Sequence, residues 1–83
     1  MLTIKVLGSG CANCKKLEAV TRQVIDQMGV QADVIKVTEY PGIMAYNIMS
    51  TPGLVINEKV VSTGRIPSTA EITTFLVNVL EAA

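Results

Sequence analysis

Two glycines and a pair of cysteines stand where an apolar segment gives way to a long amphipathic one, in the run Gly8 to Cys14 (Gly-Ser-Gly-Cys-Ala-Asn-Cys). Cys11 and Cys14 are the only two cysteines among the 83 residues. The C-x-x-C spacing serves structural thiols, half of a zinc site and redox dithiols alike. A helix start leaves backbone N–H groups unpaired and carries the positive end of the helix dipole, so a thiolate is stabilised there. The position therefore favours a reactive thiol with a lowered pKa.

Charge and hydropathy exclude several classes of protein. Seven Lys and Arg residues balance seven Asp and Glu residues, and they are scattered along the chain, which argues against nucleic acid and membrane surfaces as partners. No apolar run approaches the roughly 18 residues that span a bilayer, and the first residues lack the features of a signal peptide. We therefore expect a cytoplasmic protein, where two close cysteines are more often catalytic or metal-binding than structural.

Periodicity predicts the first half of the chain. Residues 2–7 alternate as in a strand with one buried face. From Ala12 to about Met28 an apolar stripe recurs at helical spacing, and Gly29 follows where a helix C-terminal glycine belongs. Residues 32–37 are rich in β-branched side chains and predict a second strand.

The second half predicts a short helix, a hairpin and a closing helix. Residues 39–47 are predicted to be helical, residues 54–56 and 59–62 to form a hairpin across an Asn57-Glu58 turn, and Ser68 or Thr69 with Glu71 to begin the last helix. The chain, residues 1–83, is expected to be a single α/β domain in the order β-α-β-α-β-β-α. Because hairpins are antiparallel, its four-stranded sheet is mixed, with helices on both faces.

Three landmarks of the sequence are the C-x-x-C after the first strand, Thr51-Pro52-Gly53 just before the hairpin, and the closing helix. In these landmarks the chain resembles the thioredoxin-like superfamily in its minimal form, and in particular the small redox-active disulfide proteins of archaea and bacteria. The resemblance covers essentially the whole chain. It implies a thioredoxin-like fold and a thiol–disulfide oxidoreductase that is thioredoxin-like or glutaredoxin-like and acts in electron transport.

The resemblance also implies roles for individual residues. Cys11, at the exposed helix start, is the nucleophile and Cys14 is the resolving cysteine. Pro52 is a cis-proline, as only an X-Pro bond adopts cis at low cost, and Thr51 and Gly53 join it in binding substrate. No cofactor is expected beyond the Cys11–Cys14 disulfide. The partners are a protein disulfide or glutathione and an unidentified reductase, and the protein is expected to be a monomer.

Some positions depart from the family pattern. No Trp exists in the chain, Gly10 precedes the first cysteine, and Ala12 and Asn13 stand where thioredoxins have Gly-Pro. The first strand also carries no carboxylate of the kind that thioredoxins use as a proton relay. These differences leave the fold prediction unchanged and leave the reduction potential and the partner open.

Alternatives remain for the dithiol and for its surroundings. Cys11 and Cys14 suit a soft metal such as Cu(I), although copper chaperones usually carry a Met where Ser9 stands. Zinc needs two further ligands that this chain, without His or more Cys, does not supply. A third reading is an interaction module whose dithiol never turns over.

Three further groups are weighed as contributors to the site. The side chains Ile43, Met44, Ile48 and Met49 form either core or an apolar docking patch. Lys15 and Lys16 add positive potential or simply point to water. Arg65 steers an acidic substrate or a glutathione carboxylate, or is a solvated surface residue.

Overall fold

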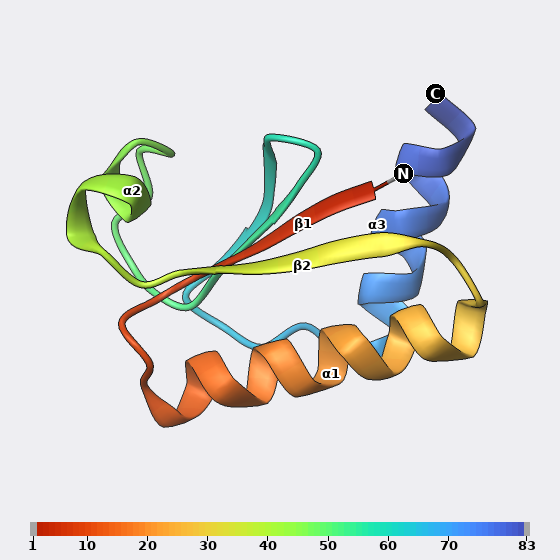
Figure 1. The fold of residues 1–83 in the computed structure, drawn as a ribbon, viewed down its shortest axis with the longest axis horizontal. Helices are drawn as coiled ribbons and strands as arrows, with labels where there is room; N and C mark the ends of the chain where they lie inside the picture. The colour runs from red at the N-terminus through yellow and green to blue at the C-terminus, as the bar shows by residue number, and fades with distance from the viewer. Residues whose placement is uncertain (1, 83) are drawn as a thin grey trace.

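β1 (Leu2–Leu7) runs through the sheet and ends directly before the loop that carries the two cysteines. The computed structural model describes residues 2–82 (Figure 1). The other elements in chain order are α1 (Ala12–Met28), β2 (Ala32–Val37), α2 (Tyr40–Met44), β3 (Gly53–Ile56), β4 (Lys59–Thr63) and α3 (Thr69–Ala82). This is the β-α-β-α-β-β-α order that the sequence predicts.

The four strands form one mixed sheet in the order β2-β1-β3-β4. β1 pairs in parallel with β2 and antiparallel with β3, and β3 pairs antiparallel with β4. The hairpin turn has positive φ at both Asn57 (49°) and Glu58 (68°), which matches the right-handed twist of the strands that it joins. The order places β1 and β3 in the centre, so the residues just before the dithiol and just after Pro52 lie on adjacent strands.

α1 and α3 cover one face of the sheet and enclose the larger core. Leu2, Ile4 and Val6 of β1 point into it, since alternate residues of a strand face the same side. They meet fully buried side chains of both helices, including Leu17, Val24, Ile72 and Leu76. At the end of α1, Gly29 adopts the left-handed conformation (φ 66°) and donates its N–H to the Ile25 carbonyl, as predicted for that glycine.

α2 lies on the other face and covers only the end at which β1 stops (Figure 1). Ile43 and Ile48 pack there against Leu7 and Val55, so the prediction of helices on both faces is confirmed. The helix is shorter than the predicted residues 39–47, because it ends at Met44 and the chain turns at Asn47, whose φ is 58°. After this turn, residues 49–51 line the same groove as Ser9 of the dithiol loop.

A triad of polar side chains ties the segment after α2 to the sheet. The Lys5 ammonium donates to the Tyr46 hydroxyl at 2.7 Å and to Glu58 at 2.6 Å, and the Tyr46 hydroxyl donates to Glu58 at 2.9 Å. These hydrogen bonds raise the pKa of Lys5 and lower the pKa of Glu58. The triad joins β1, the segment after α2 and the hairpin turn.

Candidate active site

Cys11 and Cys14 are brought together at the start of α1 and form a disulfide, with their Cα atoms 5.0 Å apart. Cys11 is the N-cap residue, and its Sγ accepts a hydrogen bond of 3.1 Å from the backbone N–H of Cys14. Cys11 is exposed, whereas Cys14 is 5% exposed. The two sulfur atoms therefore differ: one faces incoming molecules at the positive end of a helix, and the other lies one turn deeper.

Gly8 lies directly against the Sγ atom of Cys14. A Cβ added at Gly8 would overlap the Sγ of Cys14 and would lie 3.9 Å from the Cβ of Thr51. Only a glycine leaves room for that close approach. Gly8 thus lies between the dithiol and the segment before β3, and it lets both approach the end of β1.

The structure places Thr51, Pro52 and Gly53 beside the dithiol loop in different environments. Thr51 is exposed, and the peptide bond between Thr51 and Pro52 is cis. Pro52 is buried, and its carbonyl accepts a 2.9 Å hydrogen bond from the N–H of Gly64. Gly53 is buried too, in register with Leu7, and a Cβ there would lie 2.9 Å from Ile48 Cδ1. Thr51 is the member of the three that faces solvent.

A groove of about 470 Å³ opens beside the dithiol loop. The residues that line it come from the loop before Cys11, the end of β2, α2 and the segment up to β3: Ser9, Thr38, Tyr40, Ile43, Met44, Ile48, Met49, Ser50 and Thr51. Buried Ile43 and Ile48 form its floor, while Met44 is 43% and Met49 100% exposed. The four side chains weighed in the sequence as a docking patch all line this groove, and no lining residue is charged.

A smaller cavity of about 70 Å³ lies against Cys14 and shares Thr38 with the groove. Its lining includes the charged side chains of Lys15, Glu18 and Lys36. Glu18 has 18% of its side chain exposed, accepts a hydrogen bond of 3.1 Å from Arg22, and lies 3.8 Å from the Lys36 ammonium. Of the two lysines considered in the sequence, Lys15 borders this cavity and Lys16 does not.

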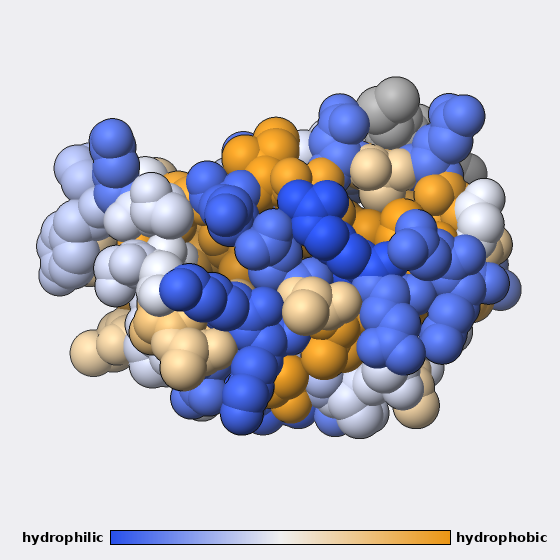
Figure 2. Space-filling model, turned by 60° about the horizontal axis from the view of Figure 1, so that its bottom comes forward, coloured by the Kyte–Doolittle hydropathy of each residue, from blue (hydrophilic) through white to orange (hydrophobic). Residues whose placement is uncertain are grey.

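Glu18 is a residue of this site that the sequence does not single out. The i,i+4 spacing from Cys14 to Glu18 was the signal that they share a face of the helix. Figure 2 shows the side of the molecule on which α1 lies, where hydrophilic residues predominate and apolar ones show between them.

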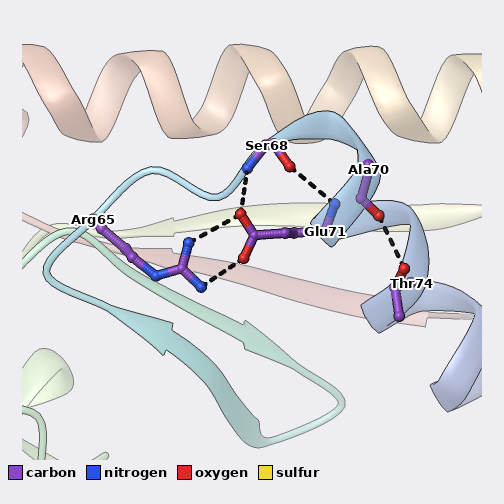
Figure 3. A network of polar contacts seen from close by, with 5 residues as sticks. All are labelled: Arg65, Ser68, Ala70, Glu71 and Thr74. Carbon is purple, nitrogen blue, oxygen red and sulfur yellow. Dashed lines mark hydrogen bonds and ion pairs between the residues drawn. The ribbon is translucent and has the colours of Figure 1, made fainter.

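Arg65, considered in the sequence as a steering charge for an acidic substrate, is paired with Glu71. Its guanidinium binds both oxygens of Glu71, at 3.2 Å and 2.8 Å (Figure 3). Glu71 also accepts from the Ser68 N–H while its own N–H donates to Ser68 Oγ, a reciprocal cap at the start of α3. The hydrogen bonds from Arg65 and Ser68 lower the pKa of Glu71 to about 2. Arg65 is therefore a structural partner of the α3 cap, with its charge compensated.

A disulfide at the start of a helix, on a four-stranded mixed sheet and beside the proline loop that precedes β3, defines an α/β protein of the thioredoxin fold. A family model described as thioredoxin domain matches residues 2–77, and the chain belongs to that family. The resemblance inferred from the sequence is thus confirmed.

Two archaeal thioredoxins are similar along nearly their whole length. The thioredoxin of Methanothermobacter thermautotrophicus is 33% identical over 72 residues, which cover 87% of this chain and 94% of that protein. The thioredoxin of Methanocaldococcus jannaschii is 31% identical over 81 residues, which cover 98% of this chain and 93% of that protein. With the Cys11–Cys14 disulfide, these relatives identify the chain as a thiol–disulfide oxidoreductase, as the sequence predicts.

Solved structures show the same fold at low sequence identity. Thioredoxin-2, described as a component of malaria parasite protein secretion machinery, superposes with a TM-score of 0.69 at 10% identity, over 94% of this chain and 82% of that one. Thioredoxin 1 from Thermosipho africanus superposes with a TM-score of 0.61 at 21% identity, over 96% of each chain. The predicted fold class is therefore confirmed independently of close sequence similarity.

Membership of the thioredoxin family indicates which cofactors and which kinds of partner to expect. Thioredoxins ordinarily use no cofactor besides their own disulfide, and they exchange disulfides with proteins and with a reductase. Among residues 2–82, no group of three or more His, Cys, Asp or Glu side chains is placed to hold a metal ion. Within the same range, no helix is long and apolar enough to cross a membrane.

Proposed function

We propose that this protein reduces disulfides in other proteins, with Cys11 as the attacking thiolate and Cys14 as the resolving thiol. The observation that carries the assignment is the difference between the two cysteines: Cys11 is exposed at the N-cap of α1, and Cys14 is 5% exposed one turn further on. A substrate disulfide can approach the first sulfur atom in line, whereas the second is shielded by the first and by Gly8.

The reaction proceeds through a mixed disulfide. The Cys11 thiolate attacks one sulfur of the substrate disulfide, a bond forms between Cys11 and that sulfur, and the other substrate sulfur leaves as a thiolate that takes up a proton. Cys14 loses its proton and attacks Cys11 Sγ, which forms the Cys11–Cys14 bond and releases the second substrate sulfur as a thiolate. Two electrons have passed to the substrate, and a reductase returns the protein to its dithiol form.

Thr51, Pro52 and Gly53 form the proposed substrate-binding segment together with the groove. Exposed Thr51 offers its backbone N–H and carbonyl to an extended chain at the rim of the groove, while buried Pro52 and Gly53 hold that residue in place. The Gly64 N–H fixes the Pro52 carbonyl, so the segment is anchored to the end of β4. Apolar substrate side chains then fit against Met44 and Met49.

Groove chemistry favours proteins over glutathione as substrates. Glutathione carries two carboxylates and an ammonium group, which need charged partners, and the lining residues of the groove are uncharged. Arg65, the cation considered for that role, is paired with Glu71. An apolar segment of a protein gains binding free energy in such a groove from the area that it buries.

Insulin reduction tests the assignment, with dithiothreitol as electron donor. We expect Cys11→Ser to abolish activity. Reduced Cys14→Ser, mixed with insulin after dithiothreitol has been removed, should accumulate a mixed disulfide through Cys11 that mass spectrometry detects. Glutathione disulfide should be a poor substrate for the wild type under the same conditions. A mixed disulfide trapped through Cys14 in Cys11→Ser, in place of one through Cys11 in Cys14→Ser, would refute the assigned roles.

We also place the protein in the cytoplasm, as a monomer of one domain. The proposed reaction needs a compartment in which a reductase keeps the dithiol reduced. Sedimentation of the purified protein tests the monomer, and alkylation of the cysteines in rapidly quenched cells tests whether Cys11 and Cys14 are reduced there.

A further inference from the structure

Two methionines contribute accessible apolar surface to the wall of the substrate groove. Met44 ends α2 with 43% of its surface exposed, and Met49, in the segment that leads to Thr51, is 100% exposed. Ile43 and Ile48, which form the floor, are 6% exposed each. The apolar atoms that an incoming substrate touches first therefore include two accessible thioether groups.

Accessible thioethers react with peroxides. The sulfur atom of methionine gives two electrons to the O–O bond, one oxygen atom becomes bound to sulfur, and the other leaves as water. The product, methionine sulfoxide, is polar and accepts hydrogen bonds from water. Because the groove has no charged lining residue, its affinity depends on apolar surface, and sulfoxides in its wall remove part of that surface.

The same two residues are open to attack when the dithiol is not. Cys11 and Cys14 are joined in the oxidised protein, so neither presents a thiolate to a peroxide. Met28, at the end of α1 far along the chain from the groove, is partly buried against the larger core and offers an internal comparison. Exposure thus ranks Met49 and Met44 ahead of Met28 as targets.

We propose that Met44 and Met49 are a peroxide-sensitive modification site, and that their conversion to sulfoxides lowers the affinity of the groove for apolar segments of protein substrates. This inference rests on the proposed function of the groove. The dithiol keeps its chemistry, so a small disulfide that does not need the groove is reduced as before. Peroxide that reaches the disulfide form then weakens protein reduction while the cysteines are protected by their bond.

The test starts from the disulfide form of the full chain. It is treated with hydrogen peroxide, the peroxide is removed with catalase, and peptide mass spectrometry locates the sulfoxides. We expect sulfoxides at Met49 and Met44 before Met28. With dithiothreitol as donor, KM for insulin should rise about fivefold. Reduction of the small disulfide 5,5′-dithiobis(2-nitrobenzoic acid), followed in a single turnover by protein that has been reduced and then freed of dithiothreitol, should stay within about twofold.

Two double variants separate oxidation of this site from damage elsewhere. Met44→Leu with Met49→Leu keeps the groove apolar and unreactive, so peroxide should leave its KM for insulin unchanged. Met44→Gln with Met49→Gln should raise KM without peroxide, because an amide imitates the polarity of a sulfoxide. Circular dichroism of each variant checks the fold.

The results separate failure of this inference from failure of the proposed function. Sulfoxides at both residues with an unchanged KM for insulin would overturn the inference, as would equal loss in the leucine variant or the absence of sulfoxides at Met44 and Met49. If Met44→Glu fails to raise KM in unoxidised protein, the proposed function of the groove fails. If Met44→Glu raises KM and the sulfoxides do not, this inference alone fails.

Discussion

The groove and the small cavity near the dithiol differ in size and in the charge of their lining residues. Beside Cys11 lies a groove of about 470 Å³ without a charged lining residue, and against Cys14 lies a cavity of about 70 Å³ bordered by Lys15, Glu18 and Lys36. The first can hold a segment of another molecule, while the second holds little more than water. Under the proposed function the two have different tasks: the groove would select the partner that reaches Cys11, and the charged groups of the cavity would influence the proton loss of Cys14.

The largest effect is expected at Gly8, which lies against Cys14 and close to Thr51. A methyl group in Gly8→Ala overlaps Cys14 Sγ and approaches Thr51, so the dithiol and the substrate segment are both displaced. We expect kcat/KM for insulin to fall about tenfold or more, with a loss of about 1–3 kcal/mol in stability from overpacking. Insulin reduction and urea unfolding measure the two effects. Wild-type activity in Gly8→Ala would show that the close approach is not needed.

A charge placed in the groove tests its apolar character. Met44→Glu introduces a carboxylate into a wall that binds by apolar contact, and we expect KM for insulin to rise about tenfold. Ala45→Glu is the matched control, because Ala45 is exposed and does not line the groove. Equal effects of the two substitutions would mean that net charge, and not the groove, determines KM.

A smaller effect, of opposite sign for two substitutions, is expected at the charged cavity. Lys36→Met removes a positive charge near Cys14 and should raise the pH at which Cys14 is alkylated by iodoacetamide, whereas Glu18→Gln should lower it. Both are measured in the Cys11→Ser background, where Cys14 is the sole thiol. Lys59→Met, on β4, should leave the alkylation profile unchanged. Shifts of the same sign would exclude a direct electrostatic effect.

The smallest effect concerns stability alone, at the cap of α3. Arg65 and Ser68 lower the pKa of Glu71 from 4.5 to about 2, so the folded state favours the ionised carboxylate. That stabilisation is complete above the unfolded pKa and is lost as the pH falls from about 4.5 toward 2. Glu71→Gln should therefore melt slightly below wild type at pH 7 and together with it near pH 2, with insulin reduction unchanged. Because both side chains are about half exposed, the difference is small. A melting difference that persists at pH 2 would contradict this account.

Long periodic segments made most of the fold predictable. α1 begins and ends where the stripe from Ala12 to Met28 and Gly29 predict, and β2 coincides with residues 32–37. The predicted α2 is too long, because a helix of five residues spans little more than one turn and its end depends on the turn at Asn47. The dithiol and Thr51-Pro52-Gly53 were visible as motifs, since each occupies consecutive residues.

Contacts between distant residues were not predictable in the same way. Glu18 already had a partner at i+4 in Arg22, and nothing in the sequence showed that Lys36 on β2 would face the same carboxylate. The sequence leaves Arg65 as either a steering charge or a solvated surface residue, because its pairing with Glu71 depends on how the loop before α3 turns back on the helix cap. The side chains of the groove were named, but its depth and its neutral lining come from the packing of α2 against Leu7 and Val55.

The polar triad of Lys5, Tyr46 and Glu58 has a consequence for solubility. One row across the four strands reads Ile35, Lys5, Val55 and Val60, on the face that α2 covers only at one end. Val55 is fully buried, and Ile35 (43%) and Val60 (36%) are exposed on the two edge strands. The charged and hydroxyl groups of the triad lie over the middle of that row, so the exposed apolar side chains stay apart. The three polar side chains thus interrupt the apolar surface of a sheet face that no helix covers along its whole length. This reduces the continuous hydrophobic area through which copies of the protein could associate.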